Sequence, residues 1–264
     1  MSATSLDGFF GGRLMLHQPA TGHRVGTDAA LLAAAIAPAE GERVVDLGAG
    51  VGAVGLAIAA AAPGVRVTLV EIDPAVSALA ADNIVANGLG ERVTLAMLDL
   101  TDAAARRQAA GLGANTADHV VMNPPFHAPG TARPSPSAYR ERAHIGLDDS
   151  DDGWSRAAAS LLRPGGSLTL IHRADALPRL LAALAGRFGD IRILPVLPTE
   201  GAAAVRVLVR AVKGSRGPLV LLPPLVLHGQ DGRFTLQAQA LHRGEVQLDW
   251  QLSTNNARQQ PAGR

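Results

Sequence analysis

The sequence predicts an α/β fold: a mostly parallel, seven-stranded sheet with helices on both faces, an N-terminal hairpin and a C-terminal extension. Two observations support this. From residue 43 onward, short β-branched runs alternate with Ala/Leu-rich segments of helical length, the pattern typical of parallel α/β sheets. The β-branched runs are apolar throughout rather than alternating, as expected for strands that helices cover on both sides.

The repeating part of the chain supplies the strands and helices of this fold. The expected strands are 43–47, 66–72, 92–98, 118–122, 167–172, 191–197 and 203–212. The expected helices are 53–62, 74–87, 151–162 and 175–188. Pro74 suits the first turn of a helix, and RPGG at 163–166 predicts a helix stop followed by a turn.

The ends of the chain depart from this rhythm. Residues 7–27 carry several glycines and predict a hairpin, after which Thr27 and Asp28 are expected to cap the helix AALLAAAIA. The segment after Lys213 contains a Pro-rich stretch and a candidate hairpin at 229–232. The last residues, STNNARQQPAGR, are polar and predict a disordered tail.

Composition sets limits on function. The chain of 264 residues is 47% apolar and 18% charged, which is ordinary for a globular protein with a sizeable core. It has no cysteine, which excludes a disulfide framework, a thiolate metal site and a cysteine nucleophile. The eight histidines are scattered, so no metal is expected, and the net charge of +1 gives no argument for nucleic acid. Without a signal peptide or an apolar run of about 20 residues, we expect a cytoplasmic protein and no membrane.

The segment VVDLGAGVGAVGLAIAA (44–60) reads as a strand, a glycine-rich turn and a helix. Glycines at 48, 50 and 52 allow a ligand to approach the backbone and leave the helix N-terminus free to meet it. The spacing Gly50-x-Gly52-x-x-Gly55 also fits the nicotinamide dinucleotide pattern, which is weak evidence when it stands alone.

Acidic residues around the glycines favour another cofactor. Asp46 precedes the loop, where it disfavours a pyrophosphate and suits an ammonium group. Glu71 ends the next strand, where it can accept both ribose hydroxyls, and Asp99 ends the third, near an adenine amino group. These features together describe S-adenosylmethionine. Asp73 competes with Glu71 for the ribose, but its position before Pro74 favours a helix N-cap.

The stretch VVMNPPF (120–126) ends the fourth strand abruptly, because proline cannot continue a hydrogen-bond ladder. Asn123 would then project its amide into the crevice at the end of the sheet. The Asn123 side-chain oxygen and the Pro124 carbonyl can accept the two hydrogens of a conjugated NH2 group, and Phe126 can stack on its ring. The chemistry expected here is methyl transfer to an amino nitrogen.

In the motifs DLGAGVG (46–52), VEIDP (70–74), LD (98–99) and NPPF (123–126) the sequence resembles the Rossmann-like class I methyltransferases. The resemblance implies a site for S-adenosylmethionine in which Asp46, Gly48 and Gly50 line the methionine end, Glu71 the ribose and Asp99 the adenine. The remaining residues expected at the cofactor are Thr27, Asp28, Gly52 and Asn123.

Further segments narrow the resemblance. Residues 11–35, the Trp154 helix, 163–175 and 213–228 resemble the bacterial tRNA (adenine-N6) methyltransferases that modify the adenine beside the anticodon of valine tRNA. The match runs over about residues 8–245. Two features depart from it: NPPF replaces NPPY, and His127 follows, as in the longer rRNA guanine-N2 enzymes. His127 is therefore expected at the rim of the site.

The resemblance implies an RNA substrate, most simply a tRNA anticodon loop, whose single-stranded base can be splayed into a pocket. The loop 133–144 is expected to contact this RNA through Arg133, Tyr139, Arg140 and Arg142. The same chemistry on an rRNA guanine N2 or a protein glutamine amide remains open, as do a nicotinamide-dependent oxidoreductase and a silent RNA-binding module. The expected divisions are 1–27 (hairpin segment), 28–213 (methyltransferase domain), 214–250 (C-terminal extension) and 251–264 (tail).

Overall fold

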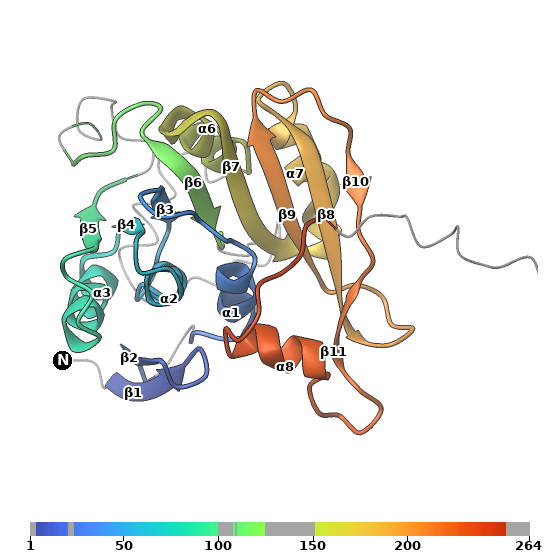
Figure 1. Cartoon of the computed structure of the whole chain (residues 1–264), viewed down its shortest axis with the longest axis horizontal. Helices are drawn as coiled ribbons and strands as arrows, with labels where there is room; N and C mark the ends of the chain where they lie inside the picture. Colours follow the sequence, from blue (N-terminus) through green and yellow to red (C-terminus); the bar gives the residue numbers. More distant parts are fainter. Residues whose placement is uncertain (1–3, 21–23, 100–107, 109, 125–150, 252–264) are drawn as a thin grey trace, which may run out of the picture.

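The computed structural model describes residues 4–20, 24–99, 108, 110–124 and 151–251. Figure 1 shows a central sheet with helices in front of it and behind it, and a separate two-stranded hairpin. The elements are β1 (Thr4–Phe9), β2 (Leu14–Pro19), α1 (Thr27–Ala34), β3 (Arg43–Leu47), α2 (Ala53–Ala61), β4 (Arg66–Glu71), α3 (Pro74–Ala86), β5 (Val93–Met97), β6 (Ala117–Met122), α6 (Asp151–Leu161), β7 (Leu162–Arg173), the 3-10 turn η1 (Ala174–Ala176), α7 (Leu177–Leu184), β8 (Phe188–Thr199), β9 (Arg206–Lys213), β10 (Val220–Leu221), β11 (Leu225–His228) and α8 (Leu236–His242).

The main sheet has the strand order β10-β8-β9-β7-β6-β3-β4-β5, and β11 also pairs with β8. Strands β3, β4, β5, β6 and β7 run parallel to one another, whereas β9 runs antiparallel to both β7 and β8. All seven expected strands form, which confirms the predicted mostly parallel α/β sheet. The short strands β10 and β11 of the C-terminal extension pair with β8 and so widen the sheet at that edge.

Helices cover both faces of the sheet because successive strand side chains point to opposite sides. Val44 packs into a core with α1, α2, α3, α8 and the hairpin. Its neighbour Val45 packs into a second core with α6 and α7. Helix α2 is buried along almost its whole length, which explains why its sequence is nearly all alanine, valine, leucine and isoleucine.

One local prediction is wrong, and a second is confirmed only in part. Helix α1 begins at Thr27 with Gly26 as its N-cap and has no side-chain cap; the Asp28 carboxylate accepts a hydrogen bond from Arg206 Nε at 2.8 Å instead. Helix α6 ends at Leu161, so the helix stop predicted from RPGG is confirmed. The predicted turn does not follow, because RPGG continues into β7 as a bulge at which the register passes from Ala117–Leu162 to His119–Ser167. Gly165, at φ +79°, supplies the local kink without leaving the sheet.

The C-terminal extension packs against the rest of the fold. The Leu248 N–H and the Trp250 indole N–H donate to the carbonyl oxygens of Ala34 and Ala35, at 2.8 and 2.7 Å, and so satisfy the carboxyl end of α1. A bridge between His228 and Phe234 closes the turn predicted at 229–232. The expected tail lies almost entirely outside the described residues. Within the described residues, no helix has the length and apolarity needed to cross a membrane.

Candidate functional site

The residues predicted to bind the cofactor meet at one edge of the sheet. Leu47, the last residue of β3, pairs with Val70 of β4 on one side and with Met122 of β6 on the other. The glycine loop, Glu71 and Asn123 therefore emerge side by side. The chain leaves β3 toward β4 and β5 and then returns to β6 on the opposite side of β3. This reversal is the switch point at which open α/β sheets bind ligands.

The glycine loop requires glycine for two separate reasons. Gly48, Gly50 and Gly52 all have left-handed backbones, with φ of +68°, +58° and +87°. A Cβ on Gly50 would meet no atom within 4 Å, so the space in front of this residue is open. A Cβ on Gly48 would lie 2.6 Å from the Trp154 ring. A ligand can therefore approach the main chain at Gly50, whereas the Trp154 ring packs against Gly48.

Glu71 is directed at this loop. Its Oε2 accepts the Gly50 N–H at 2.9 Å, and its Oε1 accepts the N–H groups of Ile72 and Asp73 at 2.8 and 2.9 Å. Asp73 is the N-cap of α3, with Oδ1 accepting from Ala75 at 2.8 Å, which confirms that prediction. Asp73 therefore caps the helix, whereas the Glu71 carboxylate adjoins the open side of the loop at Gly50.

Asp46 lies behind the loop and joins β3 to α2. Its carboxylate is 2% exposed, and Oδ2 accepts the Gly55 N–H at 2.9 Å. Burial raises the pKa of Asp46 to about 7; the Gly55 hydrogen bond opposes this rise and the charge of Glu71 adds to it. The sequence indicated an acid beside the cofactor but could not show that one oxygen is already bound to the helix.

The raised pKa of Asp46 gives folding stability a pH dependence of defined sign. The folded chain keeps a proton on Asp46 up to about pH 7, whereas an ordinary aspartate loses it near 3.8. The stability from this proton is complete below about pH 4 and is lost as pH rises toward 7. We expect Asp46→Asn to remove a slope of at most about 1.4 kcal/mol per pH unit, measured by urea unfolding of both proteins from pH 4.5 to 7.5. Parallel stability curves for the two proteins would contradict this assignment.

Asn123 follows β6 at this edge of the sheet. Its Oδ1 is buried and finds no hydrogen-bond partner among the described residues. Leaving a buried acceptor unsatisfied costs about 1–3 kcal/mol, so this oxygen is suited to a donor from a ligand. Pro124 beside it is buried. Phe126, His127 and the loop residues Arg133, Tyr139, Arg140 and Arg142 lie outside the described residues.

The start of α1 lies at the same edge. Asp28 pairs with Arg206, which faces Arg173 at the carboxyl end of β7. This ion pair joins β9 to α1. Thr27 lies beside Asp28 in the first turn of α1, and half-buried Asp99 follows β5.

Two residues at this edge were not assigned a role from the sequence. Trp154 on α6 packs its ring against Gly48, as described above. His172, near the carboxyl end of β7, is 3% exposed; its Nδ1 accepts the Arg173 N–H at 2.8 Å and its Nε2 lies 3.6 Å from Asp151. Burial lowers the pKa of His172. Neither residue has a local sequence signal, because each contact joins distant segments.

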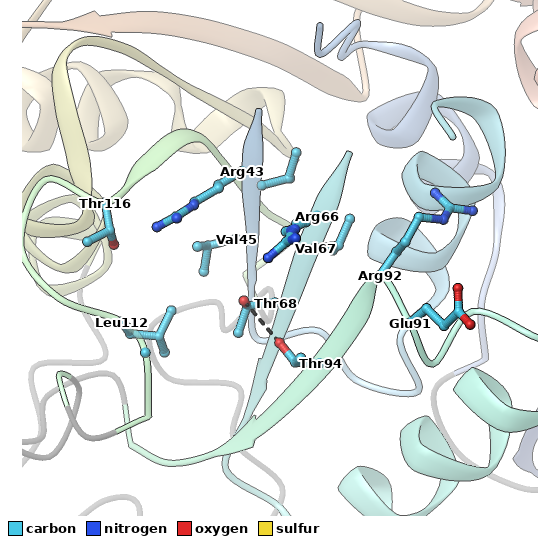
Figure 2. Close-up of a pocket in the computed structure, with 12 residues that line it drawn as sticks. Arg43, Val45, Arg66, Val67, Thr68, Glu91, Arg92, Thr94, Leu112 and Thr116 are labelled. Atoms are coloured by element: carbon cyan, nitrogen blue, oxygen red, sulfur yellow. Dashed lines mark hydrogen bonds between the residues drawn. The ribbon is translucent and has the colours of Figure 1, made fainter. Parts of the chain in front are cut away.

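A cavity of about 230 Å³ lies at the opposite edge, where β3, β4 and β5 begin (Figure 2). Arg43 and Arg66 occupy adjacent strand ends there, and the hydroxyls of Thr68 and Thr94 lie 3.2 Å apart. None of the predicted cofactor residues lines this cavity. Among the described residues, no cluster of three or more histidines and carboxylates could hold a metal ion.

Comparison with known proteins identifies the family. The model of the methyltransferase small domain matches residues 21–137. A tRNA1(Val) (adenine(37)-N6)-methyltransferase from Porphyromonas gingivalis is 32% identical over 198 residues, which are 69% of this chain and 74% of the relative. The chain belongs to the family of the tRNA1(Val) (adenine(37)-N6)-methyltransferases. The predicted resemblance is thereby confirmed, and the protein is a methyltransferase with S-adenosylmethionine as its cofactor.

Other relatives agree on the methyltransferase fold. A release factor glutamine methyltransferase from Moorella thermoacetica is 34% identical over 60% of this chain, but the alignment spans only 56% of that enzyme. The crystal structure of a predicted O-methyltransferase from Agrobacterium tumefaciens superimposes with a TM-score of 0.71. It is 33% identical and matches 84% of this methyltransferase and 98% of its own chain.

Proposed function

We propose that this methyltransferase acts on an exocyclic amine, namely N6 of an adenine in the anticodon loop of a tRNA. The observation that carries the proposal is the buried Oδ1 of Asn123 at the switch point of the sheet, which finds no hydrogen-bond partner in the part of the chain that the structure describes. An amine donates two hydrogens, and Asn123 Oδ1 with the Pro124 carbonyl oxygen offers two acceptors. A hydroxyl acceptor would leave one of them without a donor.

The residues act by holding the amine as its geometry changes. The bound cofactor supplies an electrophilic methyl group on a sulfonium. An amine conjugated to a ring is planar and a poor nucleophile, because its lone pair is delocalised. Asn123 Oδ1 and the Pro124 carbonyl stabilise the pyramidal nitrogen that forms as the new C–N bond is made, and so act mainly in the transition state. The methylated nitrogen is acidic and sheds its proton without a strong base.

The cofactor residues are proposed on the same geometry. Glu71 would exchange its Gly50 hydrogen bond for the ribose diol, while Asp46 and the backbone at Gly48, Gly50 and Gly52 would face the methionine end. Asp99 would contact the adenine, with Thr27 and Asp28 at the start of α1 beside the cofactor. The open space in front of Gly50 supports this placement. Phe126, Arg133, Tyr139, Arg140 and Arg142 remain the residues proposed to contact the RNA, and His127 the rim.

The extent of the alignments favours tRNA over the alternatives. The Porphyromonas relative named for tRNA aligns over 74% of its length, whereas the release factor enzyme aligns over 56%. A nicotinamide oxidoreductase or a silent RNA-binding module would leave the Asn123 oxygen without a purpose. A tRNA substrate agrees with the expected cytoplasmic location. The proposed divisions of the chain stay at 1–27, 28–213, 214–250 and 251–264.

The test is methyl transfer from S-[methyl-³H]adenosylmethionine into three separate substrates: unmodified tRNA, unmodified rRNA and cell protein. We expect label in tRNA, recovered as N6-methyladenosine after digestion, and none with Asn123→Ala. Label in protein, or in rRNA as N2-methylguanosine, would contradict the tRNA substrate and keep the amine chemistry. Label on a hydroxyl oxygen would contradict both.

A further inference from the structure

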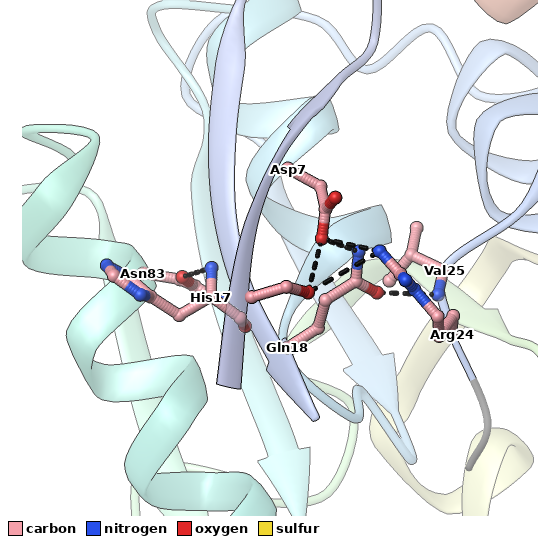
Figure 3. Close-up of polar contacts among 7 residues, drawn as sticks. Asp7, His17, Gln18, Arg24, Val25 and Asn83 are labelled. Atoms are coloured by element: carbon pink, nitrogen blue, oxygen red, sulfur yellow. Dashed lines mark hydrogen bonds and ion pairs between the residues drawn. The ribbon is translucent and has the colours of Figure 1, made fainter. Parts of the chain in front are cut away.

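Two asparagines, Asn83 on α3 and Asn87 at its C-cap, bind the outer edge of β2. Asn87 Oδ1 accepts the Met15 N–H at 2.9 Å, and its Nδ2 donates to the Met15 carbonyl at 2.8 Å. Asn83, one helical turn earlier, makes the same pair of bonds with His17, at 2.7 and 3.0 Å. Strand β1 occupies the other edge of β2, so the two amides take the place of a third strand. Figure 3 shows Asn83 facing the main chain of His17.

The hairpin that these amides hold is braced on its other side. Asp7 Oδ2 accepts from the Gln18 amide at 2.8 Å and from Arg24 at 2.7 Å, and Gln18 Oε1 accepts the Val25 N–H at 3.0 Å (Figure 3). Hydrogen bonding to Ser5 is the main cause that lowers the pKa of Asp7. These contacts join β1 and β2 to each other and to the segment before α1. They therefore restrain the position of the hairpin relative to the rest of the fold.

Only Asn83 reaches further. Its Nδ2 also donates to the Val51 carbonyl at 2.9 Å. Val51 precedes Gly52, the N-cap of α2, and lies inside the glycine loop. Asn83 is 0% exposed and uses both amide hydrogens and its oxygen, which fixes the orientation of the amide. Asn87 is half-buried, and its additional bond goes to the main-chain carbonyl of Asn83, one turn back in the same helix.

We propose that Asn83 is a positioning residue for S-adenosylmethionine, which couples the N-terminal hairpin to the cofactor loop. This inference rests on the proposed placement of the cofactor at that loop. A loop with three left-handed glycines has many accessible conformations, and ordering it on binding would cost affinity. Asn83 lowers the entropy cost of ordering the loop on binding, because it hydrogen-bonds the Val51 carbonyl and is itself bonded to the hairpin. The hairpin in turn is held in place by Asp7 and Gln18. The hairpin is therefore part of the cofactor site without touching the cofactor.

The experiment compares two variants that each remove the same kind of hydrogen-bond pair to the hairpin. Asn83→Ala and Asn87→Ala each remove one pair of bonds to β2, but only the first releases Val51. We expect both to lower Tm, while only Asn83→Ala raises the Kd for S-adenosylmethionine, about tenfold by calorimetry. With tRNA as substrate, the KM for the cofactor should rise and kcat at saturation should stay within about twofold. Equal Kd values in the two variants would overturn the proposal.

Two further measurements separate the possible failures. Glu71→Ala must weaken cofactor binding in the same calorimetry. If it does not, the loop is not the cofactor site, and both the proposed cofactor placement and the proposed role of Asn83 are wrong. If Glu71→Ala weakens binding and Asn83→Ala does not, only the coupling is wrong. Should Asn83→Ala fail to fold, amide hydrogen exchange of the wild-type protein decides. Coupling requires that the cofactor slow exchange of the His17 N–H severalfold more than that of Met15, and equal protection would refute it.

Discussion

Replacing Asn123 with alanine is expected to lower kcat for methyl transfer by roughly 100- to 1,000-fold, the range for removing one transition-state hydrogen-bonding group. The Kd for S-adenosylmethionine should change by less than about fivefold. The reason is that the buried Oδ1 of Asn123 has no partner among the described residues, so its removal costs the fold little and costs the bound amine an acceptor. Single-turnover transfer into tRNA, with the cofactor Kd from calorimetry, measures both quantities.

A matched variant sharpens this prediction. Asn123→Asp keeps an acceptor oxygen on a side chain of the same shape, loses the amide donor and adds a negative charge, which also favours the positive charge that develops on the amine. It should retain at least tenfold more activity than Asn123→Ala if the oxygen is what matters. Equal losses in the two variants would show that the amide hydrogens carry the function. A loss confined to cofactor affinity would assign Asn123 to the cofactor rather than to the amine.

The second large effect is expected at the last glycine of the loop pattern. A Cβ on Gly55 would lie 2.3 Å from Leu69 Cδ2, 3.0 Å from Val67 Cγ1 and 3.2 Å from Asp46 Oδ2. Leu69 and Val67 are 0% and 1% exposed, so their side chains are packed in the interior. Gly55→Val should therefore destabilise the protein by about 3 kcal/mol or more, because α2 must move away from β4. Urea unfolding at fixed pH measures this loss.

Gly50→Ala is the control for Gly55→Val, because its Cβ would meet no atom within 4 Å. The only cost is the left-handed backbone at φ +58°, about 1–2 kcal/mol for a residue with a Cβ. We expect Gly50→Ala to keep most of its stability and to lose cofactor affinity. Similar stability losses at the two positions would mean that backbone conformation, and not helix–strand contact, makes glycine necessary at 55.

Local signals in the sequence determined the elements and the cofactor. Strand β3 occupies its predicted residues 43–47, since an apolar β-branched run bounded by glycine is read without any distant partner. Asp73 is the N-cap it was expected to be, because a cap acts on N–H groups two and three residues away. The order of loop, acidic strand end and Asn-Pro-Pro turn likewise indicated S-adenosylmethionine and methyl transfer.

The tertiary structure alone decided which distant residues meet. Asp28 pairs with Arg206 instead of capping its helix, and Asn83 reaches both His17 and Val51. RPGG became a bulge because β6 offers the adjacent strand a ladder, which the local turn signal does not reveal. Such contacts depend on which elements become neighbours in the sheet. Residues close in sequence share a turn by covalent geometry, but residues far apart meet only where packing brings their elements together.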